Sequence, residues 1–146
     1  MTALPRPRSG LVIGYSYLWE AEYRAGREEG AKDRPCAVVI ASRTEDGDLV
    51  VTVAPIAHTP PTDPNDGLAL PAEVKRSLGL DEQPSCVIGS ELNRFVWPGP
   101  DLRPVSRRTP GQFVHGTLPG PFMRQIFERL TALRGERKPR IVFCPA

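Results

Sequence analysis

The sequence predicts one small domain of the α+β class in which β-structure dominates. Seventeen prolines and thirteen glycines interrupt the 146-residue chain too often for long helices. Short apolar runs between turn residues indicate strands, and only one late stretch has the spacing of a long amphipathic helix. The length fits a single domain with a modest core. We expect that core over residues 10–134, with 135–146 as a C-terminal arm or edge strand.

Three strands are expected in the first half of the chain. The first covers Gly10–Tyr15 and is followed by a polar connection from Trp19 to Asp33. The many charges of this connection predict a solvated, mobile loop, and loops of this length often have a function. Asp46-Gly47 is a strong hairpin signal between two apolar runs, so Pro35–Ala41 and Leu49–Pro55 are expected to pair.

Two helices are expected in the second half. Pro71–Leu78 begins with proline and is followed by Gly79, which is typical of a short helix. A longer helix is expected from Pro121 to about Arg134, because its apolar residues recur at spacings of three and four. This stripe consists of Phe122, Met123, Ile126, Phe127, Leu130 and Leu133.

The remaining segments are shorter. Pro60–Gly67 is expected as an ordered or semi-rigid loop, and Cys86–Gly89 and Arg94–Trp97 as short strands. Arg140–Cys144 is either a terminal edge strand or an arm that pairs with another chain.

The composition points away from several classes of protein. No apolar run approaches the roughly 18 residues of a membrane span, and Met1–Gly10 lacks the apolar stretch of a signal peptide, so we expect a cytoplasmic protein without membrane contact. The three cysteines and two histidines have no metal-ligand spacing, and the cysteines are interpreted as buried apolar residues in a reducing compartment. We expect neither a metal nor a cofactor.

Residues 103–146 carry a net charge of +7, which suits an acidic or phosphate-rich partner, although many such segments are only solvated surface.

Two segments predict the site. Lys32-Asp33-Arg34-Pro35 precedes one strand of the expected hairpin, and His58-Thr59 follows the other. A guanidinium, an imidazole and a hydroxyl would then meet at the ends of two paired strands. This arrangement favours polar chemistry on a charged substrate.

The order of these motifs resembles the PemK/MazF family, the ribonuclease toxins of bacterial toxin–antitoxin pairs. The resemblance covers roughly residues 10–133. Its anchors are Lys32-Asp33-Arg34-Pro35, Val53-Ala54-Pro55-Ile56-Ala57-His58-Thr59 and Asn93-Arg94-Phe95-Val96-Trp97-Pro98. It implies an SH3-like small β-barrel with a short helix and a C-terminal amphipathic helix, usually as a homodimer. It also implies metal-independent cleavage of single-stranded RNA and neutralisation by a cognate antitoxin protein.

The resemblance assigns catalytic roles to individual residues. Arg34 aligns with the family's catalytic arginine, and its planar, permanently charged group suits a pentacovalent phosphate. The alternative for Arg34 is a surface salt bridge with Asp33 or Glu29. Ala57 stands where the family usually has a catalytic threonine, so His58 or Thr59 is expected to substitute, or the activity is weakened. A histidine beside Pro60 is as often a structural hydrogen-bonding residue.

A later strand supplies a further candidate. Ser90 stands roughly where some family members have a catalytic aspartate, and Glu91 beside it is the expected replacement. A shift of one residue on a strand reverses the direction of the side chain, so this assignment is the less direct one.

Charged and aromatic residues together hold single-stranded nucleic acid through phosphate contacts and base stacking. On this basis five residues are expected to bind RNA, namely Lys32, Arg94, Trp97, Trp19 and Tyr23. Two other hypotheses remain open at this stage. One is a binding module that has lost catalysis, and the other is a structural dimer with no nucleic-acid role.

Overall fold

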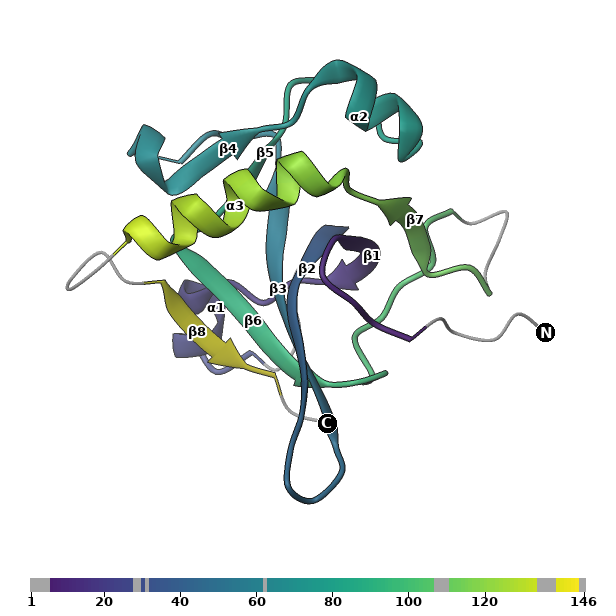
Figure 1. The fold of residues 1–146 in the computed structure, drawn as a ribbon. Coiled ribbons are helices and arrows are strands. Elements are labelled where there is room, and N and C mark those ends of the chain that lie inside the picture. The colour runs from purple at the N-terminus through teal and green to yellow at the C-terminus, as the bar shows by residue number, and fades with distance from the viewer. Residues whose placement is uncertain are drawn as a thin grey trace.

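The computed structural model describes residues 6–27, 30, 32–61, 63–106, 111–133 and 139–144. These residues form one eight-stranded sheet, three short α-helices and a 3-10 turn (Figure 1). The fold is therefore of the α+β class and mainly β, as expected. In chain order the elements are β1 (Leu11–Ser16), α1 (Glu20–Arg24), β2 (Asp33–Arg43), β3 (Leu49–Ala57), η1 (Pro64–Asp66), β4 (Gly67–Ala69), α2 (Ala72–Ser77), β5 (Cys86–Ile88), β6 (Glu91–Val96), β7 (Val114–Thr117), α3 (Gly120–Ala132) and β8 (Arg140–Phe143).

Strand β3 is the centre of the sheet. The strand order is β4-β5-β3-β2-β1-β7, and β6 pairs with β3 and β8. β3 pairs with β2 along its length, with β6 through its first half and with β5 at its end. All these pairs are antiparallel, whereas β8 runs parallel to β6. The two ends of the path, β4 and β7, are not paired with each other in the part of the chain that the structure describes.

The hairpin of β2 and β3 forms as predicted and projects from the body of the molecule (Figure 1). Gly47 has a φ of 90°, the left-handed conformation that this turn requires and that glycine adopts without a steric penalty. The register pairs Cys36 with Pro55. Because the strands are antiparallel, the start of β2 lies beside the end of β3, which confirms that the two predicted site segments are neighbours.

Apolar side chains cover both faces of the sheet. Successive residues of a strand point to opposite faces, so Val12 and Ala37 belong to one buried cluster and Ile13 and Val38 to another. Helices α2 and α3 cover the first cluster; α3 crosses the molecule between β4 and β5 on one side and β6 and β8 on the other (Figure 1). Residues of β1, β2 and β3 form much of the second cluster, to which β6 and β8 add Phe95 and Val142. The sheet therefore carries an apolar cluster on each face.

Most predicted elements are present, with small shifts of their ends. Helix α3 confirms the amphipathic stripe, except that Phe127 is 38% exposed; Arg134, its expected end, lies outside the described residues. The strands β4 and β7 were not predicted, because three or four residues are too few to show an alternating pattern. β8 confirms the terminal edge strand within the described part of 135–146.

The connection from Trp19 to Asp33 is not entirely a loop. It begins with the one-and-a-half-turn helix α1, in which Glu20 and Arg24 form an ion pair of 2.7 Å. The Trp19 backbone N–H donates to Glu22 Oε1 at 3.1 Å, which satisfies an otherwise unpaired group at the helix start. Charges that suggested a solvated loop therefore stabilise a short helix. Glu28 and Glu29 lie outside the described residues.

Two further expectations can be compared with the structure. Cys36 and Cys144 are buried, as expected of small apolar residues, and Cys86 is half-buried. Within the described ranges, no helix has the length and apolar character that crossing a membrane requires.

Candidate functional site

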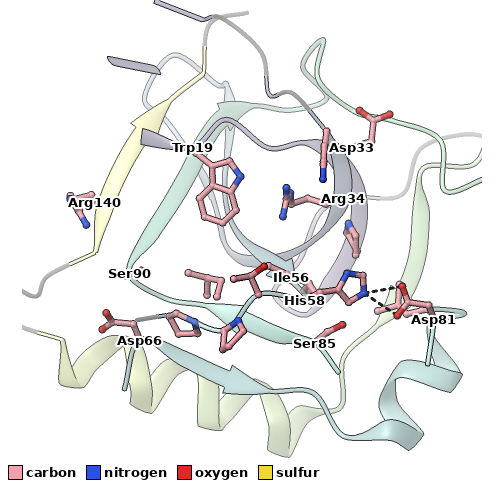
Figure 2. Close-up of a pocket in the computed structure, with 18 residues that line it drawn as sticks. Trp19, Asp33, Arg34, Ile56, His58, Asp66, Asp81, Ser85, Ser90 and Arg140 are labelled. Atoms are coloured by element: carbon pink, nitrogen blue, oxygen red, sulfur yellow. Dashed lines mark hydrogen bonds and ion pairs between the residues drawn. The ribbon is translucent and has the colours of Figure 1, made fainter. Parts of the chain in front are cut away.

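A cavity of about 850 Å³ lies where β2 begins and β3 ends (Figure 2). It gathers five of the residues that the sequence predicted for catalysis or binding. Trp19 comes from the segment before α1, and Arg34 is the second residue of β2. The five residues are Trp19, Lys32, Arg34, His58 and Thr59.

Arg34 lies against an aromatic face in this cavity. Its guanidinium carbon is 5.0 Å from the centroid of the Trp19 ring, which is a cation–π arrangement, and Figure 2 shows the two side chains next to each other. The Arg34 Nε atom is buried and has no hydrogen-bond partner. Asp33 pairs with Arg103 at 3.5 Å instead, so the predicted alternative of an Arg34–Asp33 salt bridge is wrong. The other alternative partner, Glu29, lies outside the described residues.

A buried asparagine positions the aromatic ring. Asn93 of β6 is fully buried, accepts from the Leu18 N–H at 2.8 Å and donates to the Leu18 carbonyl at 2.8 Å. Leu18 directly precedes Trp19, and Tyr17 contacts the Trp19 ring edge-on at a centroid distance of 4.9 Å. These contacts fix the backbone and one side of the ring. Trp19 is therefore a rigid platform for Arg34.

His58 forms a pair with a carboxylate that the sequence did not predict. Its Nε2 atom lies 3.0 and 2.9 Å from the two oxygens of Asp81, and the dashed lines of Figure 2 mark these contacts. Lys75 Nζ lies 3.1 Å from Asp81 Oδ1. Hydrogen bonds from His58 and Lys75 lower the pKa of the Asp81 carboxyl, so Asp81 is ionised at neutral pH. An imidazole held by a carboxylate is a candidate acid or base.

The charges around the cavity are unequally paired. Among the carboxylates that line it, Asp33 contacts Arg103 and Asp81 contacts Lys75. Lys32 and Arg34 have no ion-pair partner among the residues described by the structure. These two cations are therefore available to an anionic ligand such as a phosphate group.

The strand register shows which residue of β3 lies opposite Arg34. Cys36 pairs with Pro55, so continuing the register by two residues brings Ala57 opposite Arg34. Residues that pair across an antiparallel ladder point to the same face. A threonine at position 57 would thus share a face with Arg34, whereas Thr59 lines the cavity from beyond the end of β3.

Four predicted site residues are not brought to this cavity. Glu91 Oε1 accepts from the Glu20 N–H at 3.0 Å, and burial raises the pKa of its carboxyl. Arg94 Nε donates to Thr52 Oγ1 at 3.0 Å. Trp97 packs on Phe95, and Tyr23 is exposed on α1. The hypothesis that Glu91 joins Arg34 in catalysis is therefore not retained, and Ser90, which directly precedes β6, lines the cavity instead.

Other residues of the site were missed by sequence reasoning. Asp81 lies in the turn after α2 and Arg140 on β8, and both line the cavity; Lys75 of α2 contacts Asp81. Nothing in their spacing predicts these positions, because only the folding of α2 and β8 onto the sheet brings Asp81 and Arg140 to the cavity.

The described ranges contain no group of three or more histidine, cysteine and acidic residues that could hold a metal ion. No protein-family model, no curated protein and no solved structure matches the chain.

Proposed function

We propose that this chain is a metal-independent endoribonuclease of the PemK/MazF type, acting on single-stranded RNA. One observation carries the proposal. Arg34 lies at the strand-end cavity, against the Trp19 ring and without an ion-pair partner among the described residues. A surface arginine with a structural role would be paired, whereas an unpaired guanidinium beside an aromatic ring suits a phosphate with a neighbouring base.

The residues of the cavity fit the chemistry of metal-free RNA cleavage. The 2′-oxygen forms a bond to phosphorus as it loses its proton, and the bond from phosphorus to the 5′-oxygen breaks as that oxygen gains one. Arg34 stabilises the charge that develops on the phosphorane oxygens. His58 takes or supplies a proton, and Thr59 donates a hydrogen bond to a phosphate oxygen. Lys32 attracts the backbone of the RNA.

The decisive experiment incubates the purified protein with single-stranded RNA in EDTA and maps the fragments. We expect cleavage to products that end in a 2′,3′-cyclic phosphate. Arg34→Ala should slow cleavage by about 10²-fold or more, since it removes the group that stabilises the transition state. Arg43→Ala is the matched control, because Arg43 lies exposed at the far end of the same strand. Equal cleavage by the Arg34 variant and the wild type would refute the assignment.

A second candidate function is favoured by Ala57. This residue lines the cavity on the same face as Arg34 and has no hydroxyl. A binding module would hold RNA through Lys32, Arg34 and Trp19 without cleaving it. Such a module would need no hydroxyl at position 57. Tight, salt-sensitive binding of RNA that remains intact would favour this function over the first.

The remaining features follow from the resemblance. We propose an SH3-like barrel, and the pairing of β3 with three other strands supports it. We also propose a cytoplasmic homodimer that a cognate antitoxin protein neutralises. Expression of the chain alone should then arrest growth, and co-expression of a short reading frame encoded beside it should restore growth.

A further inference from the structure

We propose that Asp81 is the positioning residue of His58 and that it holds the imidazole with its proton on Nε2. The inference rests on the proposed function, because it gives His58 a defined role in the same cavity. Its evidence is separate from that of Arg34, since it comes from the geometry of α2 and the turn that follows it.

Asp81 determines which nitrogen of the His58 ring carries the proton. Asp81 contacts Nε2 through both oxygens, at 3.0 and 2.9 Å. An ionised carboxylate only accepts hydrogen bonds, so Nε2 must carry a proton in the neutral and in the charged imidazole alike. Nδ1 has no hydrogen-bond partner in the part of the chain described. It is therefore the nitrogen that can take a proton from the substrate or return one.

A buried lysine holds the exposed carboxylate of Asp81 in place. The side chain of Asp81 is 54% exposed, but that of Lys75 is 5% exposed and anchors it. Lys75 Nζ also donates to Ser85 Oγ at 2.9 Å and to the Gln83 carbonyl, and the Gln83 N–H donates to Asp81 Oδ1 at 3.1 Å. The turn between α2 and β5 is thereby fixed around one buried ammonium group.

Stability alone does not account for the contact between His58 and Asp81. The side chains of His58 and Asp81 are both about half exposed, and an ion pair so exposed contributes little to folding. Burying the Lys75 ammonium has a desolvation cost, and the small stabilisation from the His58–Asp81 pair gives no reason for that cost. The arrangement is better explained by the orientation of His58, which lines the cavity beside Thr59.

The contacts predict an unusual effect of Asp81→Asn. Lys75 Nζ and the Gln83 N–H both donate to Oδ1, so the amide oxygen must remain on that side. The amide nitrogen then takes the place of Oδ2, which lies 2.9 Å from Nε2, the shorter of the two contacts. Two N–H groups cannot face each other at this distance, so the amide donates to an unprotonated Nε2. This donation selects the opposite tautomer, in which Nδ1 carries the proton and cannot act as a base.

The test combines nitrogen NMR of the neutral imidazole with RNA cleavage. We expect the Nε2–H form in the wild type and in the control Glu82→Gln, which removes the neighbouring exposed charge. Asp81→Asn should show the Nδ1–H form and reduce kcat about 10²-fold with an unchanged KM. In a His58→Ala background the same change should have no further effect, since Asp81 acts through His58.

The two readouts separate the inference from the function on which it rests. An Nε2–H tautomer that persists in Asp81→Asn, or equal loss of activity in both backgrounds, would overturn the role of Asp81. Failure of the wild type to cleave RNA would overturn the proposed function, while a switch of tautomer would still support the assignment of Asp81 as the residue that orients His58.

Discussion

Asn93→Ala should be among the most damaging single changes in this chain. Asn93 is fully buried, and its side chain makes two hydrogen bonds of 2.8 Å to the backbone of Leu18, which is also fully buried. Alanine would leave the Leu18 N–H and carbonyl without partners. Each such buried group costs about 1–3 kcal/mol, so the free energy of unfolding should fall by about 2–6 kcal/mol. A domain of ordinary stability would lose a large share of its free energy of unfolding.

Urea denaturation followed by circular dichroism measures this effect. The chain offers a matched control, because its other asparagine, Asn65, is exposed and Asn65→Ala should change the free energy by no more than about 0.5 kcal/mol. The slope of the transition should be the same in all three proteins, since the surface exposed on unfolding is unchanged. A loss below about 1 kcal/mol for Asn93→Ala would refute the reasoning that Leu18 depends on this side chain.

Three other expectations concern the site and its surroundings. Ala57→Thr should increase RNA cleavage, because it adds a hydroxyl on the face of Arg34; a fragment assay at equal protein concentration decides this, and unchanged or slower cleavage would contradict it. Asp81 stabilises the fold above its ordinary pKa of 3.8, and this contribution should disappear as the pH falls through its lowered native pKa. Urea midpoints of the wild type and Asp81→Asn should therefore converge in acid, and a constant gap would be the contrary result. Iodoacetamide should label the half-buried Cys86 before the other cysteines, which mass spectrometry can verify.

The sequence alone determined the strongly local features. The turn at Gly47, the apolar runs on either side of it and the stripe of α3 follow from the preferences of a few neighbouring residues. These features were enough to predict that Arg34 and His58 would lie at adjacent strand ends, because an antiparallel hairpin brings its two open ends together.

Only the tertiary structure decided which side chains meet. Trp19 reaches Arg34 because Asn93, more than seventy residues away, fixes Leu18. Asp81 reaches His58 because a buried lysine holds the turn after α2. Ser90 lines the cavity, whereas the neighbouring Glu91 accepts a hydrogen bond from the backbone of α1. Such contacts depend on register and on the packing of distant elements, which leave no periodic pattern in the chain. The sequence thus located the strand-end site, and packing selected its residues.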